Sequence, residues 1–462
     1  MALGKREQER QESLWVETAK LAAPGHHFYI RLNKLLREAG FDPFLEELCA
    51  PYYHERGRKS IPPGVYFRML MVGYFEGIDS QRGIAWRCAD SLSLRQFLGL
   101  PLDRPTPDHS SLTRIRDRFP VELYERVFQF ILKVIGQHDL LSGPTVGGDS
   151  TTLEANAAMK SIVRKGSGED WNAYVTGLMR EDGVIEDDED PSDDERRKFD
   201  QQRKRKKVSN KEWESPSDPD ARIIRMKDGR THLGYKAEHV VDLQHEIILS
   251  ARVLEGTASD AGSLPGSLIA AQVNLIRAGS EDSIEEVTAD KGYHSNETLS
   301  ACSGFGVRTY IPEPDSKYAR VWVDKPAEHE RAVINNRQRM RRAKGKRLQR
   351  ARSEKVERSF AHTCETGGGR RTWLRGFAKI NKRYLLQAAS RNLGTLMRSL
   401  FGYGSPRGLQ GAVRGLLWFC VAASVPFPTR ASAIPRLFRF INRIFPRATC
   451  FPPLENQSLV AA

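Results

Sequence analysis

The amino-acid sequence predicts an α/β protein, in which a mixed sheet is flanked by helices, preceded by an all-helical domain. Two observations lead to this fold class. Residues 1–142 carry helix-type apolar spacing and capping residues, whereas from residue 143 β-branched runs alternate with amphipathic patterns. We therefore expect a helical domain over 1–142, an α/β domain over 143–400 with a charged insertion at 165–230, and a basic tail over 401–462.

The helical domain is predicted from four consecutive segments. Residues 65–77 (VYFRMLMVGYFEG) are apolar on all sides, as in a buried helix. Ser80 is a suitable N-cap for the helix that follows, and a short third helix runs over 92–98. In the fourth segment, residues 105–120, Thr106 is the expected N-cap and Pro107 the expected first helical residue.

This fourth helix carries Arg114, Arg116 and Arg118. A short helix, a tight turn and a basic helix can form a unit that reads DNA. An ordinary helical bundle with a solvated arginine face would have the same pattern. The sequence supports both interpretations equally, and Arg114 and Arg116 are candidate DNA contacts.

From residue 143 the predicted elements alternate. The first strand ends near Asp149, and two further strands form a hairpin over 231–243 and 246–256. They are followed by a helix at 260–279, a strand at 283–290, a helix at 296–306, a strand at 307–312 and helices at 347–362 and 375–400. Antiparallel strands followed by parallel ones, in this order, are typical of a ribonuclease-H-like domain.

The insertion is defined by its charge. Residues 186–195 (EDDEDPSDDE) are almost wholly acidic and residues 196–207 (RRKFDQQRKRKK) almost wholly basic. Such blocks rarely bury a core and are usually solvated. The basic block could contact phosphates, but pairing with the acidic block explains it as well.

Composition narrows the functional classes. The chain has 72 basic and 58 acidic residues, a net charge of +14, which favours a polyanionic partner such as nucleic acid or an anionic membrane. The first twenty residues are charged, which argues against a secretory signal. The apolar stretch 415–427 is shorter than the roughly 20 residues of a membrane span, which argues against a membrane helix there. The six cysteines are scattered without C-x-x-C spacing, which argues against a zinc ribbon or disulfide scaffold and favours the cytoplasm.

Three carboxylates are the candidate catalytic and metal-binding residues: Asp149, Asp290 and Glu357. Ligand sites of open α/β sheets form at the carboxyl ends of strands, where both aspartates are predicted. Crowded carboxylates repel one another unless a divalent cation joins them, and hard oxygen ligands select Mg²⁺ or Mn²⁺. Two such ions can activate a nucleophile and stabilise the leaving oxygen of a phosphodiester.

Each carboxylate also has an ordinary structural interpretation. Asp149 could cap a turn, and Asp290 could start one, with Gly292 supplying the unusual backbone. Glu357 could be a solvated helix residue, and Glu354 competes with it one turn back. The three structural interpretations fit less well when taken together. All three residues would then have to stand by coincidence at the positions where this fold places a ligand site.

The motifs around these residues resemble those of insertion-sequence transposases of the DDE class, from about residue 60 to 398. Residues 287–295 (VTADKGYHS) are similar to the second-aspartate motif, and 146–157 (VGGDSTTLEANA) to the first. Residues 234–260 resemble the hairpin after it, 352–360 (RSEKVERSF) the glutamate motif, and 61–77 with 107–119 the helical N-terminal domain.

This resemblance implies that Asp149, Asp290 and Glu357 carry two metal ions. It also implies that Tyr293 contacts DNA near the second aspartate, and that Arg352 and Arg358 contact phosphates. Two departures put activity in doubt: Ser353 occupies an expected arginine position, and Cys364 an expected basic one. Arg370, Arg371 or Lys379 could compensate.

A basic run precedes the glutamate. Residues 331–352 contain ten basic and no acidic residues, so the run should bind phosphates without reading bases. A solvated face is the alternative. The candidate DNA contacts in this run, besides Arg352, are Arg341, Arg342, Lys344, Lys346 and Arg347.

The sequence thus predicts a cytoplasmic, nucleoid-associated transposase that cuts double-stranded DNA at inverted terminal repeats and joins the freed 3′-hydroxyl to target DNA. The resemblance also implies a homodimer on DNA. Two alternatives stay open. One is a catalytically degenerate protein that only occupies element ends. The other is a ribonuclease-H-like nuclease that never joins DNA.

Overall fold

The computed structural model describes residues 25–408, except 55, 57–59, 187, 203–208, 227–228 and 316–319. Most of the predicted basic tail, the apolar stretch 415–427 and much of the basic block 196–207 lie outside the described residues. Among the described helices, none is both long and apolar enough to span a membrane.

The N-terminal part is all helical, as predicted. Its helices are α1 (His27–Glu38), α2 (Phe41–Cys49), α3 (Pro63–Glu76), α4 (Gln81–Asp90), α5 (Leu92–Leu98), α6 (His109–Arg118) and α7 (Val121–Gly136). Helix α3 is buried almost all round, which confirms the prediction from its apolar pattern. Ser80 caps α4 by accepting a hydrogen bond from the Gly83 amide.

The predicted start of α6 was wrong. Asp108, not Thr106, is its N-cap, because the Asp108 Oδ1 accepts a 2.8 Å hydrogen bond from the Ser110 amide. Pro107 therefore lies before the helix. Backbone hydrogen bonding to Ser110 lowers the pKa of Asp108 to about 2.

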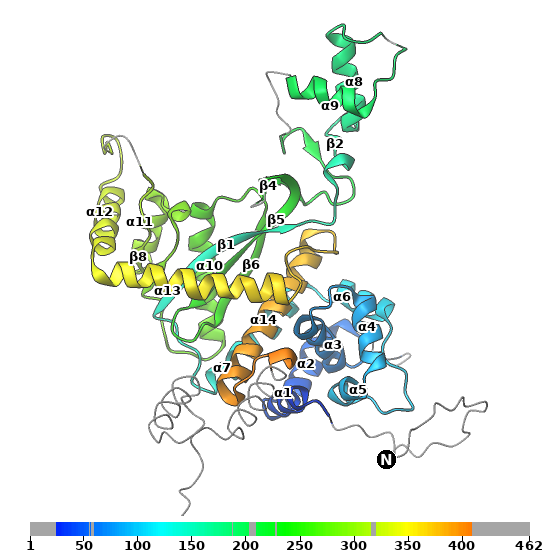
Figure 1. The fold of residues 1–462 in the computed structure, drawn as a ribbon. Helices are drawn as coiled ribbons and strands as arrows, with labels where there is room; N and C mark the ends of the chain where they lie inside the picture. The colour runs from blue at the N-terminus through cyan, green and yellow to red at the C-terminus, as the bar shows by residue number, and fades with distance from the viewer. Residues whose placement is uncertain are drawn as a thin grey trace, which may run out of the picture.

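A mixed sheet forms the centre of the second part (Figure 1). Strand β1 (Thr145–Glu154) pairs antiparallel with β5 (Thr231–Asp242) and parallel with β7 (Glu286–Thr288). Strand β6 (Ile248–Glu255) pairs antiparallel with β5, and β8 (Arg308–Tyr310) parallel with β7. These pairings confirm the predicted mixed α/β sheet and its order of strands.

Helices cover both faces of this sheet. A Cβ on Gly147 would meet Val356 of α13 (Ala343–Phe360), whereas one on Gly148 would meet Leu264 of α10 (Asp260–Arg277). Since neighbouring strand residues point to opposite faces, α13 and α10 lie on opposite sides of β1, and Figure 1 shows α13 crossing in front of the sheet. The remaining helices are α11 (Asn296–Gly304), α12 (Ala327–Arg341) and α14 (Phe377–Phe401), with a π-helix, η5 (Ala361–Thr366), between α13 and α14.

The predicted long helix at 375–400 is confirmed as α14. It packs between β6 and the N-terminal helices α3 and α7. The Asn392 amide donates to the Ile248 carbonyl and accepts from the Ile248 amide, which fixes α14 to β6. The two parts of the chain therefore share one packed interface.

The insertion contains more structure than its charge indicated. It contains α8 (Trp171–Glu181), α9 (Asp193–Gln202), β3 (Trp213–Glu214) and β4 (Arg222–Arg225), which pairs with the edge of β5. Just before the insertion, a 3-10 turn, η3 (Met159–Ser161), leads into β2 (Val163–Arg164), which forms a small sheet with β3. Figure 1 shows α8 and α9 projecting from the molecule. Val175, Met179 and Trp213 of the insertion are buried, but they lie outside the two charge blocks and so do not contradict the expectation that such blocks rarely bury a core. Arg196 pairs with Asp190 and Asp193, which favours internal acid–base pairing for this residue.

Candidate active site

The two aspartates occupy equivalent positions on neighbouring parallel strands. Gly147 of β1 is paired with Thr288 of β7, and this is the last pair that joins the two strands. Asp149 and Asp290 each follow two residues later. The predicted strand end at Asp149 needs correction, because β1 continues along β5 to Glu154. Asp149 nevertheless lies where the parallel pairing ends, beside Asp290.

Asp149 is largely buried and fully engaged. Its Oδ2 accepts a 2.7 Å hydrogen bond from Arg352 Nη1, and its Oδ1 accepts one of 2.8 Å from the Ser150 amide. Burial raises the pKa of Asp149; the Arg352 guanidinium opposes this shift, and the charge of Asp290 adds to it. The contribution of the Asp290 charge to the pKa of Asp149 is consistent with two neighbouring carboxylates.

Asp290 also has the turn role that its sequence suggested. Its Oδ1 accepts a 2.9 Å hydrogen bond from the Gly292 amide, which caps the 3-10 turn η4 (Lys291–Tyr293). Asp290 remains partly exposed. The turn therefore holds the carboxylate at the sheet edge without enclosing it.

Glu357 lies on the exposed flank of α13. Lys355 of the same helix donates to the Leu243 carbonyl at 2.5 Å, beside the start of β1. At 100° per residue, Glu357 is roughly 160° around the helix from Lys355 and so lies on the flank of α13 opposite the Leu243 contact. An open hollow on this flank is lined by Gln349, Arg350, Ser353, Glu354 and Glu357.

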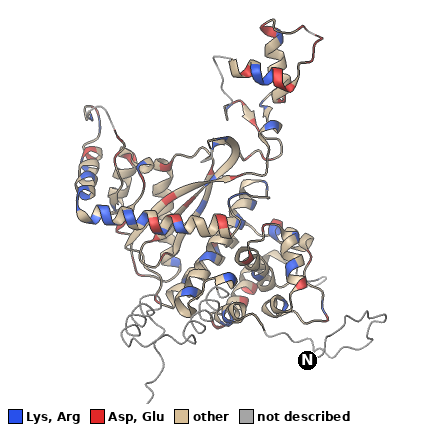
Figure 2. Ribbon diagram, viewed as in Figure 1, with Lys and Arg blue, Asp and Glu red and all other residues tan. Residues whose placement is uncertain are grey.

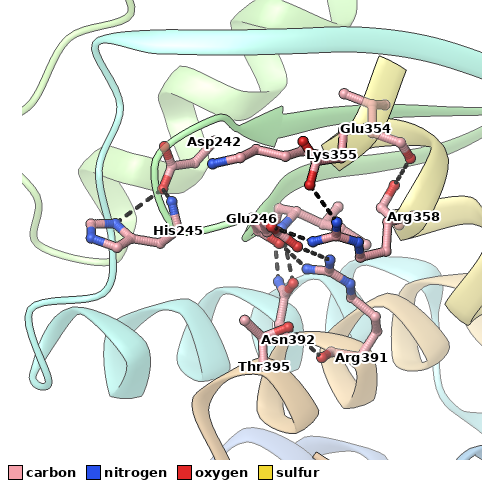
Figure 3. Close-up of polar contacts among 12 residues, drawn as sticks. Asp242, His245, Glu246, Glu354, Lys355, Arg358, Arg391, Asn392 and Thr395 are labelled. Atoms are coloured by element: carbon pink, nitrogen blue, oxygen red, sulfur yellow. Dashed lines mark hydrogen bonds and ion pairs between the residues drawn. The ribbon is translucent and has the colours of Figure 1, made fainter. Parts of the chain in front are cut away.

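Contacts at both ends fix the position of α13. Gln349 donates to the carbonyls of Ala289 (3.0 Å) and Tyr310 (2.6 Å), which follow or end β7 and β8. At the opposite end, Figure 3 shows Arg358 and Arg391 converging on Glu246 in the turn between β5 and β6. Arg358 Nη1 lies 2.6 Å from Glu246 Oε1, and Arg391 donates to the Glu246 carbonyl. These contacts tie the helix of Glu357 to the sheet of the two aspartates.

A second polar group lies on the α10 side of the sheet. Asp260 accepts from Ser150 Oγ at 2.6 Å and is paired at 2.6 Å with Lys236. Glu238 is fully buried beside them and accepts from Ser263, and its burial raises its pKa. We did not predict roles for Lys236 or Glu238 from the sequence. Two charged residues on one face of an otherwise apolar strand were the available signal.

Tyr293 belongs to this buried group. Its side chain is 0% exposed and its hydroxyl has no hydrogen-bond partner among the described residues. Burial, with the charges of Glu238 and Asp260, raises its pKa. The expected contact between Tyr293 and DNA does not fit this position, because the side chain is fully buried.

The basic residues divide into two sets. Five are exposed without a carboxylate partner among the described residues, and we call them the α13 basic face: Arg341, Arg342, Lys346, Arg347 and Arg350. Figure 2 shows lysines and arginines along α12 and the first half of α13. Other predicted DNA contacts are already paired with acids: Arg352 with Asp149, Lys344 with Glu286, and Arg358 with Glu246 and Glu354.

The two arginines of α6 also differ. Arg114 is exposed and donates to Ser110, so it remains available to a partner. Arg116 is only 8% exposed and points into the interior. A contact between Arg116 and the outside of a DNA duplex is therefore not compatible with its position.

Among the described residues, no three histidine, cysteine or acidic side chains are gathered closely enough to hold a metal ion. Asp149 takes its positive partner from Arg352 instead. The oxygen donors of Asp149, Asp290 and Glu357 still suit Mg²⁺ or Mn²⁺ in chemistry.

The chain therefore combines a helical domain with a mixed α/β domain, and Asp149 and Asp290 lie at one edge of the sheet. Two known sequence families match the chain: residues 17–118 match the Transposase domain (DUF772), and residues 314–397 match the Transposase DDE domain. The second match includes Glu357 but neither aspartate. No curated protein matches the chain. Both matched families are transposase domains, and together they support an insertion-sequence transposase of the DDE class.

Proposed function

We propose that this transposase cuts DNA at the ends of an insertion sequence and joins the freed 3′-hydroxyls to target DNA. The observation that carries the proposal is the position of Asp149 and Asp290, each two residues beyond the last pair of adjacent parallel strands. Glu357, on the exposed flank of α13 opposite Lys355, would complete the set. Strand ends of this kind are the usual ligand sites of α/β sheets.

Asp149, Asp290 and Glu357 would hold the divalent ions, after Arg352 releases Asp149. Two bound ions supply Lewis acidity, activating the attacking oxygen and stabilising the leaving one. The α13 basic face would bind the phosphate backbone near the acidic edge. Lys355, Arg358 and Gln349 would keep Glu357 in register with the aspartates, because they fix α13 to the sheet.

The substrates follow from this function. Double-stranded DNA carrying terminal inverted repeats, and a target duplex, would be the partners. Since two ends must be joined in one event, we expect a homodimer on DNA, associated with the nucleoid in the cytoplasm.

The test is a nicking assay on a duplex that carries the DNA flanking the gene. We expect Mg²⁺-dependent cleavage by the wild type, and none by Asp149→Asn, Asp290→Asn or Glu357→Gln, with DNA affinity kept within about twofold because phosphate contacts dominate affinity. Asp103→Asn is the matched control, because Asp103 is exposed and distant in sequence from the three candidate residues. Wild-type cleavage by Asp290→Asn would refute the assignment.

One observation favours a second function, a degenerate transposase that only occupies DNA ends. Asp149 is already paired with Arg352, and Cys364, at an expected basic position, is buried. Lys379, a possible substitute, lies 3.5 Å from Asp117. Binding without cleavage at any Mg²⁺ concentration would support this function. A nuclease without joining activity would cleave but give no strand-transfer product from a pre-cut 3′-hydroxyl end.

A further inference from the structure

A cavity of about 220 Å³ lies where the helical domain meets α14. Its floor includes Tyr66 and Tyr124, which are buried and joined by a 2.6 Å hydrogen bond between their hydroxyls. Its rim includes Asp79, Ser80 and Trp373, all of them exposed to solvent. A buried floor and an exposed rim describe a pocket that opens outward.

Among the charged residues of the lining, cations outnumber carboxylates: Arg116, Lys382 and Arg383 against Asp79. Asp79 is paired with Arg383 at 3.3 Å, and Lys382 donates to the Arg116 carbonyl at 3.0 Å. The Nε of Arg116 is buried without a hydrogen-bond partner among the described residues, and the carboxylate of Asp117 lies 3.7 Å from it. A buried guanidinium nitrogen without a hydrogen bond is costly unless an acceptor is supplied. The pocket is therefore suited to an anionic group.

The rim supplies an aromatic surface. Trp373 is 50% exposed, and its Nε1 donates to Asp79 Oδ2 at 3.4 Å. Arg371 lies over the Trp373 ring, 5.2 Å from its centroid. Exposed aromatic rings beside arginine are the surfaces on which unpaired bases stack. Aromatic and cationic groups together match a nucleotide better than a simple anion.

The pocket is connected to the candidate active site through β1. The Glu154 amide at the end of this strand donates to the Arg370 carbonyl at 2.9 Å, and the Thr372 amide donates to the Glu154 carbonyl at 3.0 Å. Asp149 lies five residues back along the same strand, a span of about 17 Å. This is about five stacked nucleotides of one DNA strand.

We propose that this pocket receives one unpaired nucleotide of the DNA substrate. Its base would pack against Trp373, and Arg116, Lys382 and Arg383 would neutralise its phosphate. The cavity of about 220 Å³ is too small to receive a duplex. The inference rests on the proposed function only in taking DNA as the partner.

The test measures binding without divalent metal, so cleavage plays no part. A blunt duplex is compared with the same duplex carrying an unpaired thymidine tail at its 3′ or 5′ end, by fluorescence anisotropy. We expect a tail to tighten wild-type binding about fivefold or more, and Trp373→Ala to remove this gain while leaving blunt-duplex affinity unchanged. Trp86→Ala, which removes another exposed tryptophan outside the pocket, should keep the gain.

A 5-iodo-deoxyuridine in the tail should cross-link under ultraviolet light to the peptide containing Trp373. Arg116→Met should reduce the gain from the tail at an unchanged melting temperature. Thymidine monophosphate that competes only with the tail would identify the nucleotide itself as the ligand. No gain from either tail, or an equal gain in Trp373→Ala, would overturn the inference. Failure to bind even the blunt duplex would instead refute DNA binding, and with it the proposed function.

Discussion

His239 makes the packing beneath the candidate active site sensitive to acid. It is opposite Asp149 in the β1–β5 register, fully buried, and stacked on Phe360 with ring centroids 4.1 Å apart. Its Nδ1 is 2.8 Å from Ser359 Oγ, and its Nε2 is 2.8 Å from the Tyr384 hydroxyl. The ring therefore joins β5 to both α13 and α14. Replacing it with glutamine removes the titrating group and keeps a polar side chain.

The expected size of the effect follows from the pKa. Burial, with a smaller contribution from Arg391, lowers the pKa of His239 to about 3, from 6.5. Between these values the unfolded chain binds a proton that the folded chain does not, so stability falls as the pH drops below 6.5 and is unaffected above it. At pH 5 the loss is about 2 kcal/mol, or 1.36 kcal/mol times about 1.5 pH units.

The assay is urea denaturation of wild type and His239→Gln at pH 7.5 and pH 5. The variant loses hydrogen bonds, so it should be less stable than the wild type at pH 7.5. The difference between the two proteins should shrink by about 2 kcal/mol at pH 5, because only the wild type carries the histidine penalty. An equal difference at both pH values would refute the reasoning, since other titrating groups are common to both proteins.

Three further predictions concern α13. Glu246→Gln leaves the buried Arg391 without its carboxylate and Arg358 with Glu354 alone, and should lower the free energy of unfolding by about 3 kcal/mol in urea titrations; no loss would contradict the role of this turn in fixing α13. Gly147→Ala would place a Cβ 2.7 Å from Val356 Cγ2 and should cost about 1–3 kcal/mol, whereas an unchanged melting temperature would mean that α13 shifts freely. The α13 basic face consists of Arg341, Arg342, Lys346, Arg347 and Arg350. Neutralising any one of these residues should lower the slope of log Kd against log salt concentration by about 1. An unchanged slope would mean that the residue is solvated and does not contact DNA.

Local patterns were sufficient to predict most of the fold. The hairpin of β5 and β6 was predicted from an apolar period of two residues, and the amphipathic helix α10 from a period of 3.6 residues. Both periods can be recognised within the segment itself. The start of α6 was missed because Thr106 and Asp108 are both acceptable caps. The choice depends on packing, in which Thr113 of α6 donates to Gln81 of α4 at 2.5 Å. Composition alone does not reveal that Trp213 of the insertion is buried and packs against Tyr174.

The candidate site was predictable in its residues and not in its pairings. Asp149 and Asp290 could be placed because each follows a β-branched run. The partner of Asp149 could not, since Arg352 is separated from it by 203 positions. The same holds for Tyr293 and Arg116, whose burial depends on helices and strands far away in the chain. Charge and spacing identify residues able to bind phosphate, whereas tertiary packing decides which of them are exposed.

The glycine pair before Asp149 links these two levels. A Cβ at Gly147 would meet Val356 at 2.7 Å, and one at Gly148 would meet Leu264 at 3.0 Å. Without side chains at either position, α13 and α10 approach β1 closely from opposite faces. The approach on one face brings Arg352 to Asp149, and that on the other brings Asp260 to Ser150. The short motif GGD therefore has a structural reason beyond its aspartate. It permits two helices, one following within about 120 residues and the other about 200 residues away, to position polar groups at Asp149 and at the adjacent Ser150.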